Sequence, residues 1–196
     1  PGNERAGEEP LPADAEATTD VAAATAEEQQ ETESEAADPN AAFIVNAGIV
    51  LLANFLPMFF SGLNLRDESG ELREQKRLPM LLHTLATGEH DAEECELVLP
   101  KILCGLSPSD GCEVFIELSE AEEKEIDTLL NSVISHWSML KSTGPDGLRS
   151  AFLTRTGRLR ASDERWALEV PAEAQDILLR QLPLSYSFVK LPWMRR

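Results

Sequence analysis

Cys104, His83 and His136 are the residues that could form a nucleophile and its base. A thiol beside an imidazole is the usual arrangement of a cysteine nucleophile. Cys104, however, lies in the apolar stretch 102–106, with no glycine loop of the kind that holds an oxyanion. We therefore expect a small buried thiol and predict that the chain is not an enzyme. A small thiol hydrolase is the least favoured alternative.

Metal and cofactor sites are not expected from the spacing of the possible ligands. The candidates for zinc are Cys95, Cys104, Cys112, His83 and His90. They include no C-x-x-C pair, the short chelating pair typical of zinc sites. The sequence also has no phosphate loop of the form G-x-x-x-x-G-K-[ST]. An odd number of unpatterned cysteines favours reduced thiols made in a cytoplasm.

A second group of polar residues could bind a partner. Asp146, Gly147 and Arg149 surround a predicted helix start, where an acidic side chain is favoured. Either a helix cap with a local ion pair or a partner contact would explain them. Five arginines lie close together in the sequence: Arg149, Arg155, Arg158, Arg160 and Arg165. They form either a solvated hairpin face or a docking face for an acidic partner.

Composition divides the chain into two parts. Residues 1–40 carry 12 acidic residues and one base, and almost no large apolar side chain beyond Leu11 and Val21. Such a segment cannot bury enough surface to offset its conformational entropy. We expect a disordered acidic arm over residues 1–41 and a compact, mostly helical domain over residues 42–196.

The net charge of −18 is unevenly distributed. It amounts to −11 in residues 1–40, −11 in residues 41–140 and +4 in residues 141–196. Phosphate groups repel so acidic a surface, so no nucleic-acid partner is expected. The positive block favours docking on an acidic surface. An apolar strand face at Tyr186 and Phe188, together with Trp193, could anchor that contact.

The run Phe43–Phe60 is apolar and uncharged. Runs of this length can be transmembrane helices. Because Asn46, Asn54 and Pro57 interrupt it, we expect a helix that is buried or docked on a partner, with membrane contact as the alternative.

Apolar residues at helical spacing predict further helices. They cover Leu72–Ala86, Glu93–Leu103 and Glu120–Lys141, and a short helix follows Pro145.

The helix Glu120–Lys141 has the clearest signals. Ser119 and Glu122 form a capping box at its start. Trp137 lies on its apolar stripe and is predicted to be core. His136 lies at the edge of that stripe, and we expect its ring to hydrogen-bond a neighbouring element.

After Gly157 the apolar period changes to two. Two strands turning at Asp163–Arg165, a helix after Pro171 and a third strand over Leu184–Phe188 are predicted. The fold class is therefore α+β, mostly α-helical: a helical body of about five helices followed by a small C-terminal ββαβ unit.

Six segments in order resemble one family. They are residues 46–52, 82–88, 96–105, 133–141, 146–149 with 152–153, and 190–194. Together they resemble the conserved C-terminal region of the tape measure protein of contractile injection systems, phage-tail-like particles with a sheath, an inner tube and a spiked baseplate. The resemblance covers residues 43–194. The family-motif or candidate partner-contact residues are Asn46, Gly48, His83, Gly88, Lys101, Cys104, His136, Trp137, Asp146, Gly147, Arg149, Arg155, Lys190, Pro192 and Trp193.

The resemblance implies a structural role in particle assembly. The protein would dock in the tube or baseplate lumen and help to set tube length. Its partners would be tube, hub, spike or baseplate proteins, with further copies of itself as another option. It would be made in a bacterial or archaeal cytoplasm and packed inside a particle that can be released. The alternative is a membrane-active segment delivered by the particle.

Overall fold

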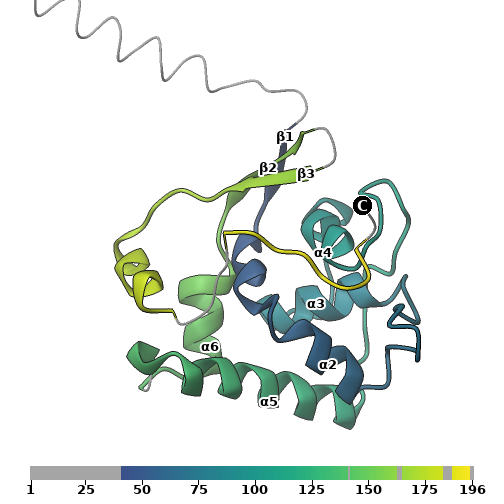
Figure 1. Cartoon of the computed structure of the whole chain (residues 1–196), viewed down its shortest axis with the longest axis horizontal. Helices are drawn as coiled ribbons and strands as arrows, with labels where there is room; N and C mark the ends of the chain where they lie inside the picture. The colour runs from purple at the N-terminus through teal and green to yellow at the C-terminus, as the bar shows by residue number, and fades with distance from the viewer. Residues whose placement is uncertain (1–40, 141, 163–164, 183–186, 195–196) are drawn as a thin grey trace, which may run out of the picture. The chain divides into compact units, whose positions relative to one another are not determined.

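The computed structural model describes residues 41–140, 142–162, 165–182 and 187–194. The predicted disordered arm lies outside this part of the chain, except for Ala41. Helices dominate the described residues and accompany one small antiparallel sheet (Figure 1). The predicted class, α+β and mostly helical, is therefore confirmed.

The α-helices are flanked by shorter 3₁₀ or π-helical turns, labelled η. In chain order the elements are β1 (Ala41–Ile44), η1 (Ala47–Leu52), α2 (Leu56–Gly62), α3 (Leu78–Thr87), η2 (Glu94–Leu97), α4 (Val98–Leu103), α5 (Glu120–His136), η3 (Ser138–Leu140), α6 (Pro145–Leu148), the π-helical η4 (Arg149–Leu153), β2 (Gly157–Ser162), β3 (Arg165–Glu169) and η5 (Ala174–Gln181).

The helix ends follow the signals in the sequence. Ser119 and Glu122 form the predicted capping box at the start of α5. Gly88 ends α3 with a φ of 85°, a left-handed conformation that favours glycine. Helix α3 begins at Leu78 rather than Leu72, and Pro79 lies in its first turn, where a missing N–H has little cost.

The sheet has the order β1-β2-β3, and both pairs are antiparallel. The predicted hairpin is confirmed by β2 and β3. The third strand is β1, whose Ala42 is opposite Leu159 of β2. The sequence predicted a third strand at 184–188. That prediction is wrong for Ser187 and Phe188, which are not in a strand. Residues 184–186 lie outside the described residues. The predicted helix after Pro171 is the 3₁₀ helix η5.

The uncharged run Phe43–Phe60 forms β1, η1 and most of α2, so the prediction of a single helix is wrong. Pairing of Ala41–Ile44 with β2 satisfies their backbone groups from a distant part of the chain, and Pro57 starts a new helix. Most of the run is buried, as Leu52, Leu56 and Phe60 show, but Phe43 and Met58 are exposed. Among the described residues no helix is long and apolar enough to cross a membrane.

Helix α3 is the centre of the core. Every residue from Leu78 to Ala86 is buried, including the polar His83 and Thr84, so other parts of the domain surround this helix. It contacts α4, η1, η2 and η4. Helix α5 runs along the lower side of the view in Figure 1, and it turns Ile126, Leu130 and Val133 inward.

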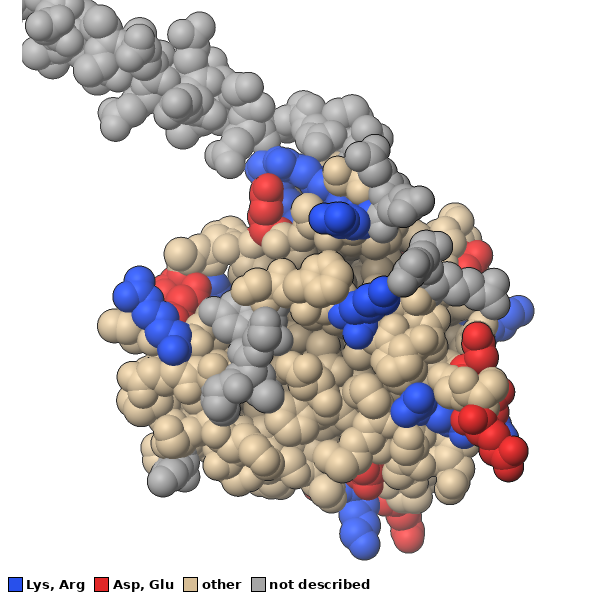
Figure 2. Space-filling model, viewed as in Figure 1, with Lys and Arg blue, Asp and Glu red and all other residues tan. Residues whose placement is uncertain are grey.

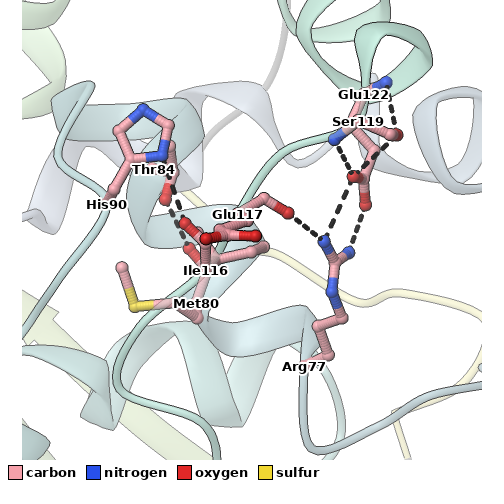
Figure 3. A network of polar contacts seen from close by, with 8 residues as sticks. All are labelled: Arg77, Met80, Thr84, His90, Ile116, Glu117, Ser119 and Glu122. Atoms are coloured by element: carbon pink, nitrogen blue, oxygen red, sulfur yellow. Dashed lines mark hydrogen bonds and ion pairs between the residues drawn. The ribbon is translucent and has the colours of Figure 1, made fainter.

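An ion pair joins the start of α3 to the start of α5 (Figure 3). The Arg77 guanidinium donates to the carboxylate of Glu122, and its Nη2 donates to the carbonyl oxygen of Glu117 at 2.9 Å. The Ser119 N–H donates to the same carboxylate at 2.8 Å. Burial acts to raise the pKa of Glu122, but these hydrogen bonds from Arg77 and Ser119 outweigh it and lower that pKa. The capping carboxylate is therefore held charged.

Candidate docking surface

A groove of about 780 Å³ is bordered by the hairpin and by the C-terminal segment, residues 187–194. Its other walls come from η1, α4 and η4. In Figure 1 the C-terminal segment, in yellow, passes below the hairpin toward α4. The groove therefore lies where the small sheet meets the helical body.

Most of the side chains that line the groove are apolar. Trp166, Leu168 and Val170 come from β3 and the residue after it, and Phe188 comes from the opposite segment. Trp166 is 42% exposed and Phe188 is 69% exposed, although both are large apolar residues. Exposed apolar side chains that share one groove make it a candidate site of association.

Arg155 lines the groove but is fully engaged within the domain. Its guanidinium forms ion pairs with Glu173 at 2.9 Å and Asp176 at 2.7 Å, and Nη2 donates to the carbonyl oxygen of Pro171 at 2.7 Å. The hydrogen bond from Arg155 lowers the pKa of Asp176. These contacts fix the segment that carries η5 to the end of η4, so Arg155 is a structural residue.

Among the described residues, Arg165 and Lys190 supply accessible positive charge to the groove. Both line it, and both side chains are exposed. Neither forms an ion pair with another residue in the described part of the chain. Figure 2 shows that uncharged surface covers most of this face and that lysine and arginine side chains gather over the sheet.

The other arginines of the predicted cluster have partners within the domain. Arg149 pairs with Asp146 at 3.1 Å, and Arg160 pairs with Glu169 at 3.3 Å. Arg158 lies 5.7 Å from the centre of the Phe43 ring, a cation–π contact. Two members of the cluster, Arg155 and Arg165, line the groove, and of these Arg155 is the one paired with carboxylates among the described residues of the domain.

Asn46 and His83, singled out from the sequence, meet in the core. The Asn46 amide Nδ2 donates to the carbonyl oxygen of Glu96 at 2.9 Å and lies 3.3 Å from Nδ1 of His83. Burial lowers the pKa of His83, although Glu96 and Glu89 act in the opposite direction. A neutral imidazole that accepts at Nδ1 fits this geometry. The pair links η1, α3 and η2.

Gly48 is required by close packing. A Cβ atom at Gly48 would lie 1.7 Å from the carbonyl oxygen of Phe152, so no side chain fits there. The backbone of η1 consequently packs directly on that of η4.

Gly88 and the Asp146–Arg149 segment meet at the end of α3. Arg149 Nε donates to the carbonyl oxygen of Leu85 at 3.2 Å, and the Cβ position of Gly88 is 3.7 Å from the guanidinium. A cation there complements the negative end of the helix dipole. The expected local ion pair is present, but no side chain caps the start of α6, and Arg149 instead bonds the C-terminal end of α3. Gly147 lies beside Thr143, and the Asp146 side chain is solvent-exposed apart from its pairing with Arg149.

Lys101, Cys104 and Trp193 lie around the end of α4. Lys101 is fully buried, with Nζ donating to Glu94 and to the carbonyl oxygen of Pro108. Trp193 is buried, and its Nε1 donates to the carbonyl oxygen of Leu103 at 2.8 Å. Pro192 beside it is exposed. The predicted anchor Trp193 is therefore part of the core.

Cys104 is buried as expected. Burial raises the pKa of the Cys104 thiol well above its ordinary value, so the thiol stays protonated near neutral pH. The rings of the two candidate bases contact other groups, Asn46 for His83 and Ser132 for His136. The described residues include no group of three or more ligands that could hold a metal ion.

Trp137 and His136 differ sharply in environment. Trp137 is 1% exposed, as predicted for core, and its Nε1 donates to the carbonyl oxygen of Leu178 at 3.1 Å. His136 is exposed, and its Nδ1 lies 2.7 Å from the carbonyl oxygen of Ser132. The expected bond to a neighbouring element is wrong, because the ring turns back onto its own helix.

One family model matches this chain. It describes the contractile injection system tape measure protein, and it matches residues 3–196. The chain belongs to this family. The resemblance expected over residues 43–194 is confirmed, and the match extends into the acidic segment. No curated protein and no solved structure gives a significant match.

The family motif and the groove overlap only in part. Of the family-motif residues, Gly48, Arg155 and Lys190 line the groove, and so do Arg165 and Phe188, which the sequence suggested as partner contacts. Most of the others position helices. Sequence reasoning did not single out Trp166 and Val170, although their alternation with Ala167 and Glu169 already places them on one face of the strand.

Proposed function

We propose that this chain docks in the tube or baseplate lumen of a contractile injection particle and helps to set tube length. Membership of the tape measure family supports a role inside the particle. The observation that carries the docking role is the groove, because exposed Trp166 and Phe188 share it with Arg165 and Lys190, which have no ion-pair partner among the described residues.

The proposal divides the work between two parts of the chain. Residues 1–40 are acidic and poor in apolar side chains, so they can span distance but cannot fix a position. The folded domain must fix the position, because only a packed surface gives a defined contact. In this account the domain holds one end and residues 1–40 provide reach.

Gene deletion with electron microscopy tests this role. Deletion should abolish assembly or give tubes of variable length, and supplying the intact gene should restore uniform tubes. Normal numbers of particles with uniform parental tube length would refute the proposal. The proposal also requires that the chain be present in purified particles, because a docked protein stays in the particle. Mass spectrometry of purified particles tests this.

A further inference from the structure

The outer edge of β3 pairs with no strand of the described residues. The sheet order is β1-β2-β3, and in the described part of the chain β3 has a strand neighbour only on the β2 side. An edge strand presents unpaired N–H and C=O groups, which can pair with another extended chain. Strand β3 has five residues and a charged residue at each end, but Trp166 and Leu168 between them line an apolar groove.

The register shows which backbone groups face the open side. The carbonyl oxygen of Glu169 points toward β2, since it lies 2.9 Å from the Cβ position of Gly157. In an antiparallel pair the direction of these groups alternates from residue to residue. The N–H and C=O groups of Leu168 and Trp166 therefore point away from β2. The same two residues turn their side chains into the groove.

This combination of backbone and side chains suits an extended peptide. A peptide that pairs with Trp166 and Leu168 would continue the sheet, and its alternate side chains would enter the groove beside Phe188. The lining of η1 and α4, including Val50 and Ile102, is apolar. The occupant must therefore carry large apolar side chains at alternate positions.

Charge at the groove adds a second requirement. Arg165 and Lys190 line it without an ion pair to a described residue, whereas Arg155 is already neutralised by Glu173 and Asp176. Complementary charge orients an encounter and excludes like-charged partners. The occupant therefore carries aspartate or glutamate next to its apolar residues.

Residues 1–40 of this chain do not meet both requirements. They are strongly acidic, but Leu11 and Val21 are nearly their only large apolar side chains. They could approach Arg165 but could not fill the groove. A segment of another protein that combines both features fits the groove better than residues 1–40 do.

We propose that the open edge of β3 receives an extended segment of another particle protein as a fourth strand, with alternate apolar side chains in the groove and an acidic residue against Arg165 and Lys190. This inference rests on the proposed docking role, because the partner must be present in the same particle.

Photo-crosslinking in assembled particles tests the proposal. Trp166 is replaced by benzoylphenylalanine in the full chain, and Asn131, an exposed residue of α5, is replaced in the same way as the control. Mass spectrometry of the crosslinks at 166 should identify one segment of one other particle protein, with alternating apolar residues and an acidic residue. Position 131 should not crosslink to that segment.

A charge reversal provides the second arm. Arg165→Glu with Lys190→Glu should reduce the crosslink yield at position 166 by at least about tenfold, because the acidic segment is then repelled. The matched control, Arg73→Glu with Lys76→Glu, changes an exposed Arg and Lys outside the groove and should leave the yield unchanged. Thermal unfolding of both double variants should match that of the parent.

The other outcomes overturn the inference. Crosslinks from 166 to this chain, yields no higher than at 131, or equal yields after charge reversal would each exclude a fourth strand from another protein. A chain that is retained in particles but gives any of these results contradicts the inference alone. A chain absent from particles contradicts the proposed function as well.

Discussion

The indole Nε1 of Trp193 donates a hydrogen bond to the carbonyl oxygen of Leu103 at 2.8 Å, although 90 residues separate them in sequence. The ring also meets Phe60 edge-on, at 5.3 Å between ring centres, and Arg66 lies over it. Gly105, with a φ of 78°, lets the chain pass close to the Trp193 backbone. Trp193 therefore holds the segment 187–194 against α2 and α4.

Trp193→Ala should lower the free energy of unfolding by about 3–5 kcal/mol, because it removes a buried ring and leaves the Leu103 carbonyl unpaired. Denaturant unfolding measures the change. Trp166→Ala is the matched control, since Trp166 is 42% exposed, and it should cost less than about 1 kcal/mol. Equal costs for the two tryptophans would show that Trp193 is not part of the core.

Gly48→Ala should destabilise the domain by at least about 1–3 kcal/mol, the usual cost of overpacking. The added methyl group would lie 1.7 Å from the Phe152 carbonyl oxygen, so η1 and η4 must separate. Gly111→Ala is the control, because nothing lies within 4 Å of its Cβ position. It should change stability by less than about 0.5 kcal/mol in the same denaturant experiment. A Gly48→Ala protein as stable as the parent would contradict the close packing of these two segments.

Glu122 should make stability depend on pH in the acidic range. In the folded protein the pKa of Glu122 is lowered from 4.5. The stabilisation by the charged carboxylate is therefore complete above the pKa of the unfolded state, and it is lost as the pH falls through the pKa of the folded state. The free energy of unfolding of Glu122→Gln should therefore decrease less steeply than that of the parent as the pH falls below about 5. Unfolding midpoints measured from pH 7 to pH 3 test this. Glu123→Gln, an exposed neighbour on α5, should retain the parental pH profile; an identical profile for Glu122→Gln would disprove the role of the ion pair.

Cys104→Ala should leave particle activity intact, because the buried thiol packs against the core and stays protonated. In the native protein a thiol reagent should label exposed Cys95 but not Cys104. Inactive particles from a variant that folds and assembles normally would instead indicate a chemical role for this thiol.

Local signals predicted the parts of the fold that depend on neighbouring residues. The sequence predicted three such features: the capping box at Ser119, the end of α3 at Gly88 and the hairpin of β2 and β3. Each depends on residue types and periodicity within a few neighbouring residues. The strand Ala41–Ile44 was not predicted, since its hydrogen bonds go to β2, more than a hundred residues later. The spacing of apolar residues along the chain does not indicate a pairing strand that lies so far away in the sequence.

The site was only partly predictable for the same reason. Lys190 and the alternating pattern around Phe188 pointed to a docking face. The burial of Trp193 did not follow from sequence, because an apolar residue near a chain end can anchor a partner or close the core. The engagement of Arg155 by Asp176 also depends on the path of the chain between them.

Tube length after a change in residues 1–40 tests the central claim most directly. Duplicating residues 11–40 adds 30 residues of the same composition. The account predicts uniform tubes that are longer by a fixed increment, between about 45 Å for a helical insert and about 100 Å for an extended one. The control carries the same 30 residues inserted at Gly111, an open loop position in the folded domain.

Electron microscopy of purified particles from both strains gives the length distributions. The predicted result is a shifted, narrow distribution for the duplication and the parental distribution for the Gly111 insertion. Unchanged tube length with the duplication, in particles that contain the longer chain, would contradict a length-setting role. An equal shift with the Gly111 insertion would contradict the division into a reaching segment and a docking domain.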